Sequence, residues 1–285
     1  MFVRNAVAIT SLLASLSNAL PAKRAVDAGN ARLVIYWGAE DDSTTLSDVC
    51  SDDSYGISAG ATGLKDGSGI VDAIKQCQSA GKLVILSLGG ADADVTLQSD
   101  SDGEKIADTL WNLFGGGTEN AELRPFGDVK LDGFDLDNES GDSTGYLAMT
   151  KRFRSNFQSD TSKSYYLTAA PQCPFPDASE PLDVCKELDY VWVQFYNNGD
   201  CNIAQSDFKN SVQTWSSGIG NATLFIGALA SGADGDQGYV DADTLVSSLQ
   251  DVKNMNLPNY GGAMLWEAQL AVKNGNFQKK IAAGL

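Results

Sequence analysis

Short apolar runs alternate with helix-like apolar spacing from about residue 32 to the end of the chain, and this pattern constrains the fold more than any other feature. Seven runs have the length of strands, and they lie at residues 33–37, 83–88, 129–137, 166–170, 190–195, 224–228 and 262–266. The segments between them place apolar residues three or four positions apart, as amphipathic helices do. Because strands that alternate with helices build a parallel sheet, we predict an α/β protein made of repeated strand–helix units.

The length of the chain fits either one barrel or two small domains, since it has 285 residues. No proline- or serine-rich linker divides it, so we predict a single domain. A closed barrel needs an eighth strand between Trp37 and Leu83. Segment 54–63 lies in this interval, but it is rich in glycine and alanine and does not resemble a buried barrel strand.

The segment 131–139, Leu-Asp-Gly-Phe-Asp-Leu-Asp-Asn-Glu, places three carboxylates at alternate positions of a predicted strand. Alternate residues of an extended chain face the same side, so Asp135, Asp137 and Glu139 form a row opposite the apolar residues between them. Close carboxylates raise one another's pKa, which keeps a proton available for general acid catalysis. A calcium loop or a solvated acidic turn fits less well, because the flanks are apolar and glycine precedes the row.

Composition limits the chemistry and the partners. The chain has no histidine, which excludes Ser-His-Asp and Cys-His catalysis and every histidine-containing metal site. The chemistry is therefore assigned to carboxylates, hydroxyls or amides, and no cofactor is implied. The net charge is −17, and three basic residues but no acidic one precede residue 25, so residues 25–285 carry −20. Nucleic acid and anionic lipid are poor partners for such a chain.

The N-terminus resembles an export signal. Residues 1–19 combine a basic start, an apolar core and a small-x-Ala cleavage site, which predicts a secreted, extracellular protein. Lys23 and Arg24 are either a dibasic site that ends a short propeptide at 20–24 or an ordinary exposed basic pair. No other apolar run approaches the roughly 18 residues of a membrane span, so no membrane partner is expected. Five cysteines in an exported chain indicate two disulfides and one free thiol, and spacing alone does not pair them.

Two motifs in order resemble the family 18 glycoside hydrolases, in particular the plant- and fungal-type (class III) chitinases. Residues 132–139 fit the family pattern D-G-x-D-x-D-x-E, and residues 87–90, Ser-Leu-Gly-Gly, fit its S-x-G-G pattern on the preceding strand. Other strand ends are similar to the family as well, at residues 36–38, 170–174, 194–198 and 264–266. The resemblance extends over about residues 32–270.

The resemblance implies a single (β/α)8 TIM barrel formed by the catalytic domain at 25–285, with the active site at the carboxyl ends of the strands. It also implies two disulfides, Cys50–Cys77 and Cys173–Cys201, with Cys185 left as a buried free thiol.

Residue roles are implied by the same resemblance. Glu139 protonates the leaving oxygen, Asp137 orients the acetamido nitrogen of the sugar, and Asp135 modulates the proton on Asp137. Tyr196 hydrogen-bonds the acetamido carbonyl. The residues assigned to substrate binding are Trp266, Gln194, Tyr36 and Asn197.

Competing structural interpretations exist for several of these positions. Core packing is the alternative for Tyr196 and Trp266, and tight barrel packing is the interpretation we favour for Ser87, Gly89 and Gly90.

The chain departs from the family pattern at two places. Ala39 and Glu40 follow Gly38 where the family usually continues with Gln-Asn. The segment that should carry the second strand is shortened and unlike the family, so either the barrel is irregular there or the sequence has lost an exon-sized piece. A barrel without that strand would have two open edges.

The implied function is that of a monomeric, secreted endochitinase acting on chitin or N-acetylglucosamine oligomers. All three acids lie on one strand face, which favours substrate-assisted retaining catalysis, in which the 2-acetamido group of the sugar replaces a protein nucleophile. An endo-β-N-acetylglucosaminidase acting on N-glycans is one alternative. A non-catalytic carbohydrate-binding barrel is another; the presence of Glu139 opposes it, and the altered second-strand segment favours it.

Overall fold

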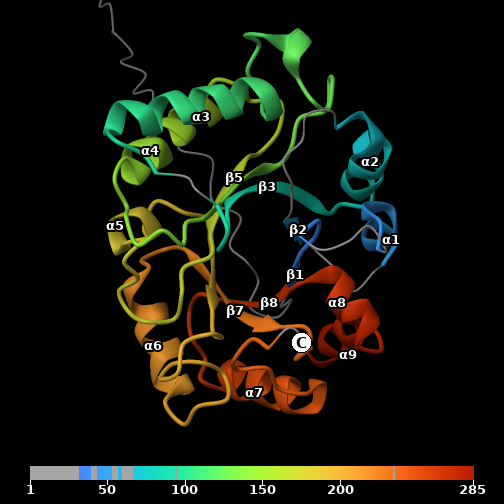
Figure 1. Ribbon diagram of the computed structural model, residues 1–285, viewed down its shortest axis with the longest axis vertical. Coiled ribbons are helices and arrows are strands. Elements are labelled where there is room, and N and C mark those ends of the chain that lie inside the picture. Colours follow the sequence, from blue (N-terminus) through green and yellow to red (C-terminus); the bar gives the residue numbers. More distant parts are fainter. Residues whose placement is uncertain (1–31, 40–43, 53–56, 60–66, 94–95, 234) are drawn as a thin grey trace, which may run out of the picture.

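Eight parallel strands close into a barrel in the computed structural model (Figure 1), in the order of the sequence, with the last strand paired to the first. The structure describes residues 32–39, 44–52, 57–59, 67–93, 96–233 and 235–285. The strands are β1 (Arg32–Tyr36), β2 (Ile57–Ala59), β3 (Leu83–Gly89), β4 (Gly133–Asp137), β5 (Tyr166–Ala169), β6 (Tyr190–Gln194), β7 (Thr223–Leu229) and β8 (Tyr260–Trp266). The predicted α/β barrel is confirmed.

Helices surround the barrel (Figure 1), and α3 and α4 lie side by side on one flank. The helices are α1 (Leu46–Ser51), α2 (Val71–Ser79), α3 (Asp100–Phe114), α4 (Tyr146–Phe157), α5 (Leu182–Cys185), α6 (Phe208–Gly218), α7 (Ala242–Asn254), α8 (Ala268–Lys273) and α9 (Phe277–Gly284), with short 3₁₀ turns η1 (Ser68–Ile70) and η2 (Ala121–Leu123). Polar caps begin the two longest helices: the side chain of Ser99 accepts the N–H of Asp102 at the start of α3, and Asp241 accepts two N–H groups at the start of α7.

The apolar core has an outer and an inner part. Between sheet and helices, Phe134 of β4 stacks on Phe153 of α4 with ring centroids 4.5 Å apart, and both are fully buried. Inside the barrel, bulky side chains such as Trp192, Phe225 and Met264 fill the interior. The apolar face of β4 therefore packs outward, which turns its acidic face into the barrel.

The eighth strand lies inside the segment that its composition had argued against. β2 is three residues long and pairs with both neighbours, with Val34 opposite Ile57 and Ile57 opposite Leu83. The expected shortening is confirmed, whereas the inference that segment 54–63 is unlike a strand is wrong. Parallel pairing uses backbone groups alone, so two flanking strands can hold a short strand of weak side-chain propensity.

The disulfides implied by the resemblance are both present. Cys50–Cys77 joins α1 to α2, and Cys173–Cys201 joins the loop after β5 to the loop after β6. Cys185 is the buried free thiol among the described residues. No helix in the described ranges is both long enough and apolar enough to cross a bilayer. The predicted signal at 1–19, the propeptide at 20–24 and Glu40 lie outside the described residues.

Removing the second disulfide should destabilise the fold. Replacing Cys173 and Cys201 by serine frees a loop that spans 28 positions, and we expect the free energy of unfolding to fall by about 3–4 kcal/mol because the unfolded chain gains entropy. Urea unfolding followed by circular dichroism measures this. Cys185→Ala, which opens no loop, is the control, and an unchanged urea midpoint in the double variant would contradict the expectation.

Candidate active site

The three predicted carboxyl groups meet at the carboxyl end of β4. Asp135 and Asp137 are buried inside the barrel, and Glu139 follows two residues later with partial exposure. The pairing register sets Ser87 of β3 and Thr168 of β5 on either side of Asp135. The side-chain row expected from strand alternation is therefore present, and neighbouring strands surround it with polar groups.

Asp135 is the most enclosed acid of the row. Its Oδ2 accepts hydrogen bonds from the hydroxyls of Tyr36 (2.7 Å) and Ser87 (2.8 Å), and its Oδ1 accepts from Thr168 (2.6 Å). Trp192 Nε1 in turn donates to the Tyr36 hydroxyl at 2.7 Å. Burial raises the pKa of Asp135 to about 6, although these hydrogen bonds oppose the shift.

Asp137 shares its surroundings with two other acids. Burial raises the pKa of Asp137 well above its ordinary value, and the charges of Asp135 and Glu139 and a hydrogen bond with Glu139 raise it further. Gln194 Nε2 donates to Asp137 Oδ1 at 3.1 Å. Asp137 therefore keeps its proton to a higher pH than an exposed aspartate would.

Two amides hold Glu139. Gln194 Nε2 lies 3.1 Å from Glu139 Oε1, and Gln172 Nε2 lies 3.3 Å from Oε2. The Gln194 amide also donates to the carbonyl of Ala170 at 2.9 Å, which fixes which side of the amide faces the acids. Each side-chain oxygen of Glu139 thus has a donor, one from the end of β6 and one from the loop after β5.

Aromatic side chains line the barrel interior beside the acids. Tyr196 is buried, and burial followed by the charges of Asp137 and Glu139 raises its pKa well above the ordinary value, so its hydroxyl stays protonated as a donor. Trp266, at the end of β8, is half-buried with its ring centroid 5.3 Å from that of Tyr36. Both residues also pack against the apolar side chains inside the barrel, so core packing and a role in the site are compatible for them.

Asn197 is the predicted site residue that lies apart from the acids. It is exposed, its amide donates to Asp236 at 3.1 Å, and its carbonyl oxygen accepts the N–H of Gln237 at 2.9 Å. It therefore ties the loop after β6 to the loop after β7. Its neighbour Asn198 reaches toward the row instead, with Nδ2 3.2 Å from Gln172 Oε1.

Several site residues were given no role from the sequence, or a different one. Tight packing is the right interpretation for Gly89, where an added Cβ would lie 2.1 Å from the carbonyl oxygen of Asp137. For Ser87 packing alone is wrong, because its hydroxyl binds Asp135. Thr168 had no sequence signal of its own, since only the register between β4 and β5 brings it to the row. Gln172 lies in the segment 170–174 that resembles the family, but the resemblance gave it no role.

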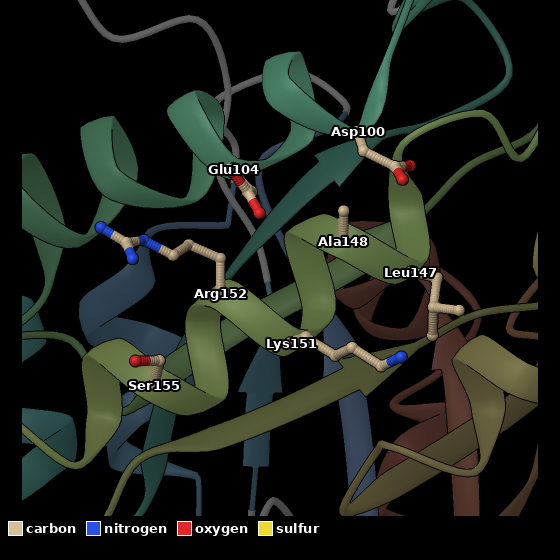
Figure 2. Close-up of a pocket in the computed structure, with 7 residues that line it drawn as sticks. All are labelled: Asp100, Glu104, Leu147, Ala148, Lys151, Arg152 and Ser155. Atoms are coloured by element: carbon tan, nitrogen blue, oxygen red, sulfur yellow. The ribbon is translucent and has the colours of Figure 1, made fainter.

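A groove of about 370 Å³ lies elsewhere, on the outer helical surface (Figure 2). Figure 2 shows Arg152 of α4 extending toward α3, which carries Glu104, whereas Lys151 points away from α3. Arg152 is bound to Asp108 at 2.7 Å. The residues that line this groove carry charges of both signs and form no catalytic arrangement. Within the described ranges, no group of three or more acids or cysteines is arranged to hold a metal ion.

Comparisons with known proteins agree with this geometry. Residues 32–227 match the family described as glycosyl hydrolases family 18. Endochitinase 3 of the fungus Metarhizium robertsii is 59% identical over 319 aligned positions that cover 100% of both chains. The chitinase ICChI from Ipomoea carnea has a TM-score of 0.78 at 31% identity, covering 89% of this chain and 100% of that one. The xylanase and α-amylase inhibitor protein XAIP-II from Scadoxus multiflorus has a TM-score of 0.79 at 28% identity, covering 89% and 98%.

The chain belongs to family 18 of the glycosyl hydrolases. It is a glycoside hydrolase, and plant and fungal chitinases are among its relatives. The alignment with the Metarhizium protein is 34 positions longer than the 285-residue chain, so this chain lacks residues that the relative has. The barrel is closed nevertheless.

The buried carboxyl of Asp135 should make stability depend on pH. Its pKa is about 6 in the fold against an ordinary 3.8, so the folded state holds this proton more tightly. Its contribution is fully present below about pH 4 and is lost as the pH rises through about 6, a fall of about 3 kcal/mol in the free energy of unfolding. Urea unfolding at a series of pH values measures it.

Asp135→Asn is the comparison variant for this measurement. It removes the titrating group and also the charge that raises the pKa of Asp137, so its stability should fall less between pH 4 and 6. Parallel pH dependences of the parent and the variant would show that Asp135 does not titrate there.

Proposed function

We propose that this protein is a secreted endochitinase that hydrolyses β-1,4 linkages between N-acetylglucosamine units by substrate-assisted, retaining catalysis. The observation that carries the proposal is the row of Asp135, Asp137 and Glu139 at the carboxyl end of one strand, where burial and the neighbouring acids raise the pKa of Asp137. Three acids on one strand approach the scissile bond from one side, so the sugar itself supplies the nucleophile on the other. The Metarhizium relative is named an endochitinase at 59% identity, which supports the same activity.

The reaction begins with proton transfer from Glu139 to the glycosidic oxygen, as the carbonyl oxygen of the 2-acetamido group attacks the anomeric carbon and the glycosidic bond breaks. Asp137 orients the acetamido N–H and balances the positive charge of the oxazolinium ion that forms. Glu139, now a carboxylate, then takes a proton from water as that water attacks the anomeric carbon. The oxazolinium ring opens and the acetamido group is restored, with the configuration at the anomeric carbon retained.

The remaining residues bind and orient the sugar. The protonated hydroxyl of Tyr196 donates to the acetamido carbonyl, where charge changes during the reaction. Trp266 and Tyr36 form an aromatic surface on which the sugar packs. Gln194 donates to both Asp137 and Glu139 and so holds the two side chains in place. Asn197, exposed at the rim, contacts a sugar farther from the cleavage point.

The setting of the enzyme follows from its covalent structure and charge. The two disulfides favour an oxidising, extracellular compartment, in keeping with the export signal predicted for residues 1–19. The substrate is an uncharged polymer or oligomer of N-acetylglucosamine, for which the net charge of −20 on residues 25–285 brings neither attraction nor repulsion. We propose that the enzyme acts as a monomer.

Hydrolysis of a fluorogenic chitotrioside by the parent and by Glu139→Gln tests the function. The variant loses the proton donor but keeps the side-chain shape, so we expect kcat to fall by about 100-fold or more. Circular dichroism of both proteins shows whether they are folded. A folded parent without activity would contradict the proposal. Cleavage of a high-mannose glycoprotein in place of chitotrioside would point to N-glycans as the substrate.

The pH dependence of the rate offers a second test. Because catalysis requires a proton at the row, where the pKa of Asp137 is raised, we expect an acidic optimum and a decline toward alkaline pH. The measurement is kcat/KM for the chitotrioside from about pH 3 to 9. A rate that keeps rising above about pH 8 would be incompatible with general acid catalysis by this row.

A non-catalytic barrel is the second candidate. One observation favours it: the Scadoxus protein, which is named an inhibitor of other enzymes, has a similar fold at 28% identity. Against it stands the complete row of acids, with Glu139 held by Gln172 and Gln194. If the parent is folded, binds insoluble chitin and does not cleave the chitotrioside, this candidate replaces the first.

A further inference from the structure

Two further acids lie in the loop between β5 and α5, next to the catalytic row. Glu180 is fully buried and Asp177 is 9% exposed, although charged side chains are rarely enclosed without a specific partner. Neither residue belongs to the motif on β4. Their hydrogen bonds connect the β5–α5 loop to the catalytic row.

Glu180 binds the backbone of the row itself. Its Oε1 accepts the peptide N–H of Asn138 at 2.9 Å, and Asn138 is the residue between Asp137 and Glu139. The side-chain amide of Asn138 also donates to the carbonyl of Ser179 at 2.9 Å. Residue 138 is therefore fastened to the β5–α5 loop through both its backbone and its side chain.

Asp177 shapes the loop that presents Glu180. Its Oδ1 accepts the N–H groups of Ser179 (2.9 Å) and Glu180 (2.7 Å), and its Oδ2 accepts that of Gln172 at 3.3 Å. Gln172 is one of the two amides on Glu139. One loop thus supports Glu139 in two ways, through Gln172 at the carboxylate and through Glu180 at the preceding peptide.

The chemistry of the Glu180 site favours an uncharged carboxyl group. Its Oε2 is buried and has no hydrogen-bond partner among the residues that the structure describes. An unpaired charged oxygen costs far more to bury than an unpaired neutral one. Burial raises the pKa of Glu180 well above its ordinary value, and the charges of nearby acids raise it further. The titratable groups that interact with it are Asp135, Asp137, Asp177, Tyr146 and Cys185.

We propose that Glu180 is a positioning residue for the catalytic acid: as a neutral carboxyl group it holds the peptide N–H of Asn138 and thereby sets the direction in which Glu139 leaves β4. It touches no substrate. Its effect passes through one hydrogen bond to the peptide that joins Asp137 to Glu139.

Glu180→Gln and Glu180→Leu separate this role from others. Glutamine keeps an uncharged oxygen acceptor, so we expect kcat and the pH profile to stay within about threefold of the parent. Leucine has a similar size but no acceptor, and kcat should fall by about tenfold or more while KM changes much less, because a displaced acid impairs the chemical step. Chitotrioside hydrolysis across the pH range measures both.

Two results would overturn the proposal. If Glu180→Gln loses as much activity as Glu180→Leu, and the acidic side of its pH–rate profile shifts, then the residue acts through its charge. If Glu180→Leu keeps the parental kcat, then the hydrogen bond does not position Glu139.

Controls guard against a merely structural effect. Glu187→Gln and Glu187→Leu change a half-buried acid shortly after α5, in the same stretch of chain, and should leave kcat unchanged. Thermal unfolding checks that each variant is folded. If Glu180→Leu fails to fold, Glu180→Asp decides: its shorter side chain cannot keep the bond to Asn138, so it should be slower than Glu180→Gln. Equal or higher activity in the aspartate variant would refute the assignment.

Discussion

The buried carboxyl of Asp135 is the group around which the barrel and the active site are both organised. An acid enclosed in an apolar interior needs hydrogen-bond partners, and Asp135 finds them on three other strands: Tyr36 on β1, Ser87 on β3 and Thr168 on β5. Trp192 of β6 extends the network by donating to Tyr36. The polar centre of the barrel therefore depends on the closed arrangement of strands, and residues of one strand alone could not form it.

The same exclusion of water makes the acids interact strongly. In a medium of low polarizability the charges of Asp135 and Glu139 act directly on Asp137 and raise its pKa, which explains why a proton stays within the row. Several surface acids have a lowered pKa instead. The pKa of Asp108, for example, is lowered by its hydrogen bond with Arg152. Burial, more than residue type, decides which carboxyl groups can act as acids.

The loop after β5 supports the catalytic end of β4. In this loop Gln172 contacts Glu139 and Glu180 binds the peptide N–H before it, while Asp177 accepts the backbone N–H groups of both. The disulfide Cys173–Cys201 joins the loop to the one after β6. A rigid frame of this kind holds a catalytic group within the small tolerance that proton transfer needs. The short second strand lies on the far side of β3 from β4, so the irregular part of the barrel is not paired with the catalytic strand.

Local sequence patterns determined the repeated strand–helix order, the inward row of Asp135, Asp137 and Glu139, and the outward packing of Phe134, because strand alternation depends only on neighbours along the chain. Family motifs added the closed barrel and both disulfides. Three matters were decided by the tertiary structure alone: the pairing of β2, the hydroxyl partners of Asp135, and the turning of Asn197 toward Asp236. Each of these joins residues distant in sequence, and such contacts are set by the register between strands and the burial of polar groups, which a local pattern does not encode.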